Sequence, residues 1–448
     1  MNGDGKPVFD AGKIAGLDAA FAVVRAIGVP EEQKIEDEDR RQHLVRGVAA
    51  GLHRSRAFLL VAPLLLFLAI TYLMPIGGIL FRSVDDSALQ TWMPKTAAAF
   101  AQWDGAGLPD DDMLAVFAAE LGQARKEHTI GRVANHLNYR MSGMRSLFNK
   151  AGRRLAAGAG PPDGAGRWRE WLVELDPRWG RQQTWATIKA ASGRYTSANY
   201  LAALDLHRDD DGGVARQPEG KRIYLRIFLR TLWVSLAVTL FCLLLGFPIA
   251  HLMAGLPPRI SNWLMIMVLL PFWTSLLVRT TSWITLLQSS GVINSTLVWL
   301  GLIGDDERIQ MVFNLTGTVV AMTYVLLPFM VLPLYSVMRG IPRSLTSVAV
   351  SLGATPLTAF ARVYLPQTLV GVGAGSLLVF MLAVGYYITP ALVGGQSGQL
   401  ISNFIFYHIK VSLNWGFASA LGVILLAAVL LIYWVYHKLV GIEKMRVS

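Results

Sequence analysis

The sequence predicts an all-α, polytopic membrane protein with six transmembrane helices and a helical extracytoplasmic insertion between the first and the second. Three observations support this fold class. The chain has 448 residues, of which 53% are hydrophobic and only 16% charged, whereas an average soluble domain carries about 25% charged residues. Six windows stay apolar over about 20 residues, the length that crosses a bilayer. The connection formed by residues 82–221 is much too long for a simple loop.

Each predicted span is an apolar window almost free of charge. Five of the six contain no Asp, Glu, Lys or Arg, and the third contains only Arg279. Prolines fall inside several windows, which spanning helices tolerate when neighbouring groups satisfy the backbone. The windows are Ala57–Phe81, Leu232–Met253, Trp263–Leu287, Leu315–Met338, Val370–Leu392 and Phe417–His437.

Basic residues near the ends of the windows set the predicted orientation, because cytoplasmic connections are enriched in Lys and Arg. Arg54 and Arg56 precede the first span, and the tail 439–448 is also basic. Both termini are therefore expected in the cytoplasm, with residues 1–56 as a cytoplasmic N-terminal segment. The formal net charge of +11 is interpreted as this loop bias and an attraction to anionic membrane lipids. It predicts no nucleic-acid partner.

The insertion, residues 82–221, is predicted to be a folded helical domain outside the cytoplasm. Acidic residues open the stretch 108–127 and basic residues close it, which suits the helix dipole, and its apolar residues recur at helical spacing. The stretches 129–155 and 167–191 show similar stripes. Spaced tryptophans in short helices are interpreted as core residues rather than as a surface that stacks on a ligand. They are Trp168, Trp171, Trp179 and Trp185.

The sequence lacks the common nucleotide-binding, metal-binding, redox and hydrolase motifs. It contains no phosphate-binding G-x-x-x-x-G-K-[ST] loop, no HExxH, no CxxC and no GxSxG. The single cysteine, Cys242, cannot form an internal disulfide and is interpreted as an inert packing residue. The histidines show no ligand spacing. The sequence therefore predicts no catalytic residue, no metal site and no cofactor in this chain.

Residues 341–366 are predicted to form a stiff helical hairpin on the cytoplasmic side, between the fourth and fifth spans. Gly353 suits the C-terminus of a first helix, and Thr355 and Pro356 suit the N-cap and first position of a second. Pro366 is expected to close the hairpin before the next span. A stiff hairpin can transmit force to a soluble partner. An apolar stripe at i, i+3, i+4 and i+7 marks the first helix: Leu345, Val348, Ala349 and Leu352.

The spacing of this hairpin resembles the EAA loop of bacterial ABC importer permeases, E-A-A-x-x-x-G, nine residues, then I-x-L-P. Gly353 takes the position of the glycine, and Val363 that of the isoleucine. Ser347 stands where the family usually has glutamate, which removes one charge contact with the ATPase. The resemblance assigns ATPase coupling to Leu345, Ser347, Ala349, Leu352, Gly353, Ala354, Val363, Leu365 and Pro366.

Two further stretches resemble the spermidine/putrescine branch of that family, "LLPFWTSLLVRTTSWITLLQSSGVINSTLVWLGLI" and "GYYITPALVGG". The resemblance covers the first span and residues 221–448, with a permease core at 222–438 that holds five spans. It implies a permease subunit in the bacterial inner membrane that works by alternating access on a small, polyamine-like solute. It also implies a second permease, identical or different, two ATPase subunits that bind ATP and Mg, and an extracytoplasmic solute-binding protein.

Four residues are candidates for the translocation path: Arg279, Tyr386, Tyr387 and Thr389. Arg279 is the only formal charge inside a window, and an intramembrane charge indicates function by default. Counted along a straight helix from Asn262, it lies about 25 Å in, which favours gating or structural pairing near the outer side over contact with the solute. The tyrosines precede a proline break, where they either line the path or pack. No carboxylate accompanies Tyr386, unlike in some polyamine permeases.

Two other classes of protein compete with this interpretation. A membrane-anchored sensor acting through the insertion would need a cytoplasmic output domain, and only 11 residues follow His437. An ion-coupled carrier would show buried acids in its spans, and the six windows contain none.

Overall fold

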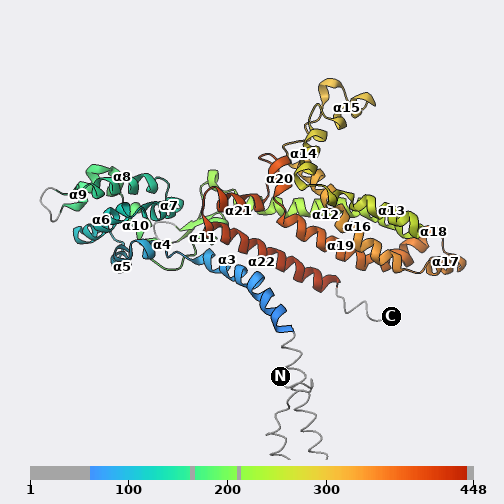
Figure 1. The fold of residues 1–448 in the computed structure, drawn as a ribbon, viewed down its shortest axis with the longest axis horizontal. Coiled ribbons are helices and arrows are strands. Elements are labelled where there is room, and N and C mark those ends of the chain that lie inside the picture. The colour runs from blue at the N-terminus through green and yellow to red at the C-terminus, as the bar shows by residue number, and fades with distance from the viewer. Residues whose placement is uncertain (1–60, 162–166, 209–212, 441–448) are drawn as a thin grey trace, which may run out of the picture. The chain divides into compact units, whose positions relative to one another are not determined.

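The computed structural model describes residues 61–161, 167–208 and 213–440 (Figure 1). Helices dominate the described residues, and the prediction of a mainly all-α membrane protein is confirmed. The exception is a pair of antiparallel strands, β1 (Leu206–Arg208) and β2 (Val214–Arg216), inside the stretch predicted to be helical. Strands of three residues show too little alternation to be recognised from sequence. The chain divides into two units at Gly77/Gly78, which are described separately.

The first unit contributes most of an apolar helix, Val61–Val84, which is long enough to cross a membrane. It includes a π-helical turn, η1 (Ala69–Leu73), and then α3 (Met74–Val84), whose last residues belong to the second unit. The predicted first window began at Ala57, and its first four residues lie outside the described part, as do the predicted cytoplasmic segment and most of the tail.

The insertion folds around large apolar side chains, as a small soluble domain does. The centre of its core holds Trp179 and Trp185, 1% and 2% exposed, with ring centroids 4.9 Å apart. Trp168 and Trp171 pack against the edge of this core, so the interpretation of the tryptophans as core residues is confirmed. The helices are α4 (Ala88–Trp92), α5 (Pro94–Gln102), α6 (Asp111–Lys126), α7 (Ile130–Arg140), α8 (Met144–Ala156), α9 (Trp168–Leu175), η2 (Pro177–Gly180), α10 (Gln182–Ala190), α11 (Ala198–Ala203) and η3 (Glu219–Lys221).

Helix α6 shows why the local signals in the insertion are informative. The side chain of Asp110 accepts a hydrogen bond from the backbone N–H of Met113 at 2.9 Å, capping the helix start. Arg125 and Lys126 occupy the last turn, where the helix dipole favours positive charge. The buried face includes Phe117. A capped, amphipathic helix of this kind is recognisable from the sequence alone.

The permease core consists of long apolar helices and shorter connecting ones. Four of its helices could each cross a membrane: Tyr224–Gly255, Leu315–Gly340, Pro356–Gly385 and Trp415–Lys438. The elements are α12 (Tyr224–Gly255), α13 (Pro258–Leu269), η4 (Leu270–Trp273), α14 (Leu276–Leu287), α15 (Val292–Trp299), η5 (Asp305–Glu307), α16 (Leu315–Gly340), α17 (Ser344–Ser351), α18 (Pro356–Ala359), η6 (Phe360–Tyr364), α19 (Leu365–Gly385), α20 (Ile388–Val393), α21 (Ile401–Lys410) and α22 (Trp415–Val440).

Two predicted windows are interrupted in the structure. The third window, Trp263–Leu287, is bent by 97° between η4 and α14, so the expectation of one straight helix is wrong. Pro271 sits in the short η4 helix before the bend, where it cannot donate a backbone hydrogen bond and disfavours a continuous helix. The fifth window, Val370–Leu392, is broken at Tyr386–Tyr387, and α20 follows.

The helices α12, α16 and α19 pack against one another through small residues (Figure 1). A Cβ atom on Gly375 of α19 would lie 2.8 Å from the sulfur and 3.2 Å from the carbonyl oxygen of Met330 in α16. Only glycine permits this approach. Close packing of backbones is typical of helices in a membrane, where burial of apolar surface drives association much less than in water.

The insertion is fixed to the core at the start of α12. Asp205 is 7% exposed, and its carboxylate accepts hydrogen bonds from the backbone N–H groups of Ile223, Tyr224 and Leu225 at 3.2, 3.1 and 2.9 Å. The hydroxyl of Tyr139 also donates to the carbonyl of Ser412. These contacts hold the insertion at one end of α12, and the hairpin lies at the other.

Candidate functional site

The turn of the hairpin forms as its residue types require. Helix α17 ends at Ser351, and Gly353 has a φ of +92°, a left-handed conformation that favours glycine. The Thr355 hydroxyl oxygen accepts a hydrogen bond from the N–H of Thr358 at 3.3 Å, and Pro356 is the first residue of α18. Ala354 donates its N–H back to Ala349 at 3.1 Å. The predicted turn and helix start are therefore present.

The second arm of the hairpin differs from the prediction. Leu365 and Pro366 do not close it, because the helix continues without a break from Pro356 to Gly385. A π-helical turn, η6, precedes Pro366, which stands in the first turn of α19, where the missing N–H of a proline is tolerated. Gln367 donates its side-chain amide to the carbonyl of Val363 at 2.8 Å. The second arm and the fifth span are consequently one continuous helix.

The predicted apolar stripe of the hairpin is largely exposed within this chain. Leu352 and Leu357, on either side of the turn, are 84% and 77% exposed, and Val348 is 56% exposed. Leu345 is also exposed, while Ala349 and Ala354 are partly buried. A contiguous apolar surface at the tip of a helical hairpin is typical of a site that another protein covers.

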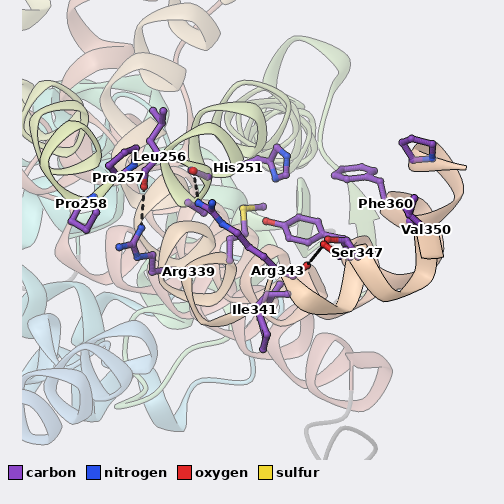
Figure 2. A pocket seen from close by; sticks show the side chains of 18 residues that line it. His251, Leu256, Pro257, Pro258, Arg339, Ile341, Arg343, Ser347, Val350 and Phe360 are labelled. Carbon is purple, nitrogen blue, oxygen red and sulfur yellow. Dashed lines mark hydrogen bonds between the residues drawn. The ribbon is translucent and has the colours of Figure 1, made fainter. Parts of the chain in front are cut away.

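Behind the hairpin lies a cavity of about 950 Å³, between α17, η6 and the adjoining ends of α12 and α16 (Figure 2). Arg339 donates to the carbonyl of Leu256 at 3.3 Å, and Arg343 donates to the carbonyl of Gly255. Ser347 lines the cavity, and its hydroxyl donates to the carbonyl of Arg343 at 3.3 Å. The position of the usual glutamate is therefore neutral and bonded within its own helix.

His251 was not singled out by the sequence, and it faces the hairpin from α12. Its ring makes edge contacts with Phe360 and Tyr364, with centroids 5.5 and 5.0 Å away. A histidine inside an apolar window carries no spacing signal, which is why only the structure reveals this contact. Together with the two arginines, it joins the hairpin to the end of α12.

Arg279 lies in the first turns of α14, immediately after the bend. It is 8% exposed, and its guanidinium donates to the carbonyls of Pro271 and Thr274 and to the hydroxyl of Thr274, the last two at 3.1 and 3.4 Å. The estimate of its depth along a straight helix is wrong, because the 97° bend separates it from Asn262. The hydrogen bonds of its side chain go to the residues at the end of η4.

The other three path candidates surround the break after α19. Tyr387 is 38% exposed, and its ring stacks on Phe406 with centroids 5.2 Å apart. Thr389 is fully buried. Tyr386 is the first residue after α19 and packs against the buried cluster of α12, α16 and α19. Of the three candidates, only Tyr387 forms a stack with a second exposed ring, that of Phe406, and this stack offers an aromatic surface.

The described residues contain no group of three His, Cys, Asp or Glu side chains that could hold a metal ion. Cys242 is fully buried, and its thiol donates a hydrogen bond to the carbonyl of Thr323 at 3.4 Å. The site is therefore defined by packing surfaces and backbone geometry rather than by reactive groups.

The permease core is similar in sequence to known proteins. The family model described as "Binding-protein-dependent transport system inner membrane component" matches residues 223–440. The spermidine/putrescine transport system permease protein PotB of Salmonella typhimurium (strain SL1344) is 36% identical over 229 residues, which cover 50% of this chain and 79% of the relative. PotB of Escherichia coli (strain K12) is 35% identical over 222 residues, with coverages of 49% and 80%.

One solved structure aligns with about half of this chain. A chain in the crystal structure of a bacterial alginate ABC transporter, in complex with an alginate pentasaccharide-bound periplasmic protein, aligns with a TM-score of 0.43 and 19% identity. The alignment covers 49% of this chain and 79% of that one.

Proposed function

Since the chain belongs to the family of binding-protein-dependent transport system inner membrane components, in its spermidine/putrescine branch, we propose that it imports a polyamine-like cation by alternating access. The protein is an inner-membrane permease subunit of an ABC importer and not an enzyme. The observation that carries the coupling mechanism is the exposed apolar hairpin, whose second arm is one helix with the fifth span from Pro356 to Gly385.

The hairpin is the proposed contact for the ATPase subunits on the cytoplasmic side. Its exposed leucines, Leu352 and Leu357, offer the apolar surface that such a partner covers. Movement of the hairpin passes directly into α19, because no loop separates them. It also passes to α12 through the bonds of Arg339 and Arg343 to the carbonyls at the end of that helix. Movement of the ATPase subunits is therefore transmitted to α12 and α19 together.

The neutral Ser347 changes how this contact is made. A glutamate at that position could pair with a basic residue of the ATPase, whereas the serine hydroxyl is bonded to the carbonyl of Arg343. Apolar packing by the exposed stripe is therefore proposed to supply the coupling contact in this chain. ATP and Mg are bound by the ATPase subunits in this scheme.

The stack of Tyr387 and Phe406 is the proposed contact for the cationic solute. Both rings are partly exposed, at 38% and 44%, and lie nearly parallel at 20°. Aromatic faces attract ammonium groups, and the apolar windows of this chain contain no carboxylate that would do so. The second permease, which completes the path, is proposed to supply the remaining contacts.

Uptake by a reconstituted complex tests this function. The chain is placed in proteoliposomes with its second permease, the two ATPase subunits and the binding protein, and ATP-dependent accumulation of labelled spermidine and putrescine is measured. The proposal expects accumulation of at least one polyamine, inhibited by excess unlabelled polyamine. ATP-dependent import of an anionic solute with no polyamine uptake would contradict the proposed substrate class, and uptake without ATP would contradict the mechanism.

A further inference from the structure

Two spans of the core are interrupted, and beside each interruption a buried side chain donates hydrogen bonds to backbone carbonyls. One lies between η4 and α14, at Thr274–Ser275, and the other between α19 and α20, at Tyr386–Tyr387. Within a bilayer core little water reaches the ends of an interrupted helix, so protein donors must satisfy the carbonyls there. The side chains that donate to these carbonyls therefore help to fix the geometry of each interruption.

Arg279 supplies further donors at the first interruption, where the carbonyl of Pro271 also accepts from the N–H and the hydroxyl of Thr274 at 3.3 and 2.8 Å. Its guanidinium reaches back across the bend to the carbonyls of Pro271 and Thr274. Arginine presents five N–H donors in a planar fork, so one side chain can serve several acceptors. Since the side chain is only 8% exposed, its hydrogen bonds to the backbone of its own span are shielded from solvent.

Asn403 supplies a second donor at the second interruption, where the carbonyl of Tyr387 also accepts from the N–H of Ala391 at 3.0 Å. It lies on α21, is 8% exposed, and donates its side-chain amide to the carbonyl of Tyr387 at 2.8 Å. Its amide oxygen accepts from the N–H of Leu400 at 3.0 Å, so the side chain is fixed at both ends. The neighbouring Ser402 donates to the carbonyl of Val384 at 3.0 Å.

The two interruptions meet in one part of the core. Helix α14 contacts α20, and Leu287 and Val393 share a buried apolar cluster. Arg279 therefore holds the start of α14, and Asn403 holds Tyr387 at the start of α20. These two helices contact each other. A change at either interruption would shift α20 relative to α14.

We propose that Arg279 and Asn403 are positioning residues that hold the two interruptions in a fixed geometry and so orient the Tyr387–Phe406 stack for transport. In this role the charge of Arg279 acts on backbone carbonyls and does not contact or repel the solute. The role in transport rests on the function proposed above, whereas the geometry can be measured without it.

A distance measurement across the first bend tests the role of Arg279. Spin labels replace Asn262 on α13 and Thr285 on α14, both exposed, while the fully buried Cys242 stays unlabelled. At 1.5 Å per residue, a straight helix would separate the two backbone positions by about 35 Å, and the 97° bend reduces this to about 23 Å. The wild-type complex should give a narrow distribution near the shorter value.

Arg279→Gln should broaden this distribution toward longer distances and lower the polyamine transported per ATP hydrolysed by about tenfold, the order expected for lost charged hydrogen bonds. Arg279→Lys should restore both only in part, because an ammonium group keeps the charge but lacks the planar fork of donors. Arg226→Gln, at an exposed arginine of α12, is the matched control and should change neither. An unchanged distribution in Arg279→Gln, with altered preference between spermidine and putrescine, would assign Arg279 to the solute and overturn the proposal.

Asn403→Leu tests the second interruption independently, also where Arg279→Gln does not assemble. With labels at Leu369 on α19 and Lys410 on α21, both exposed, it should broaden the distance across the second break and lower transport per ATP. The affinity for loaded binding protein should stay unchanged. A wild-type distance distribution in Asn403→Leu would overturn the role of Asn403. Absence of polyamine uptake by the wild-type complex would instead contradict the proposed substrate and leave both distance tests intact.

Discussion

The insertion and the permease core bury different kinds of groups. The insertion encloses large aromatic side chains, such as Trp179 and Trp185, and its buried Asp86 pairs with side chains of the same region. The core packs backbones closely at Gly375 and buries polar side chains, such as Arg279 and Asn403, against interrupted helices. Side-chain volume therefore stabilises the first region, while satisfaction of backbone groups shapes the second. Substitutions of the same size should act differently in the two.

The largest effect is expected from removal of the insertion. Its folded part closes where Asp85 pairs with Tyr195, so residues 87–192 can be replaced by a short Gly/Ser linker that leaves Asp205 in place. We expect complex assembly and basal ATP hydrolysis to survive, because the core helices keep their contacts. Stimulation by loaded binding protein should fall severalfold and its apparent affinity should weaken, since we propose that the insertion forms part of the docking surface.

Measurement of ATP hydrolysis against binding-protein concentration distinguishes the alternatives for this deletion. A stabilising cap with no part in docking predicts unchanged stimulation at unchanged affinity. That result in a correctly assembled deletion variant would remove the docking proposal.

Truncation inside the aromatic core should unfold the insertion selectively. Trp185 contacts Trp179 and Phe117 at 4.9 and 5.4 Å between ring centroids, and Trp185→Ala should lower the free energy of unfolding of this region by about 3–5 kcal/mol. Hydrogen exchange should show lost protection in α6 and α10 and retained protection in α16. Trp299→Ala, at a site 82% exposed, is the control. Equal loss of protection in α16 would show that the two regions fold as one.

Loss of the carboxylate that joins the two regions should have a smaller effect. Asp205→Ala removes the acceptor for three N–H groups at the start of α12 and should cost about 1–3 kcal/mol locally. Amide exchange of Tyr224 and Leu225 should accelerate. Asp205→Asn keeps one acceptor and a residue type that tolerates the φ of +58°, so it should recover part of the protection. Equal exchange in wild type and Asp205→Ala would show that the cap does not hold the helix start.

The smallest effect is a pH dependence confined to the insertion. The side-chain hydrogen bond from Arg178 holds the pKa of Asp176 at about 2, below its ordinary 3.8. A carboxyl with a lowered pKa in the folded state stabilises it fully above the unfolded pKa, and the contribution disappears as pH falls through the folded pKa. The stability difference between wild type and Asp176→Asn should be constant above about pH 5 and shrink between pH 4 and 2. A difference that stays constant down to pH 2 would contradict this assignment.

Local signals predicted much of the fold, and contacts between distant residues account for what was missed. The cap of α6 and the turn at Gly353 depend on neighbouring residues, so their sequence patterns were informative. The bend before α14 was missed because a proline such as Pro271 is also tolerated inside a continuous span, and the contacts of Arg279 that hold the bend are visible only in the structure. Asp205 and Asn403 act on residues that lie 16 to 20 positions away, and no periodicity records such pairs. In the site, the positions of the hairpin residues were predicted, but the continuity of the second arm with α19 was not.

The central claim is that the hairpin couples ATP hydrolysis to transport, and two glycines allow a direct test. Gly353 in the hairpin and Gly158 in the insertion have φ values of +92° and +81°, and a Cβ atom would meet nothing within 4 Å at either. Valine therefore imposes a similar backbone strain at both sites. The measurement is polyamine transported per ATP hydrolysed in the reconstituted complex. Coupling through the hairpin predicts a strong fall in this ratio for Gly353→Val, with continued ATP hydrolysis, and a normal ratio for Gly158→Val. A normal ratio in both variants would contradict the claim.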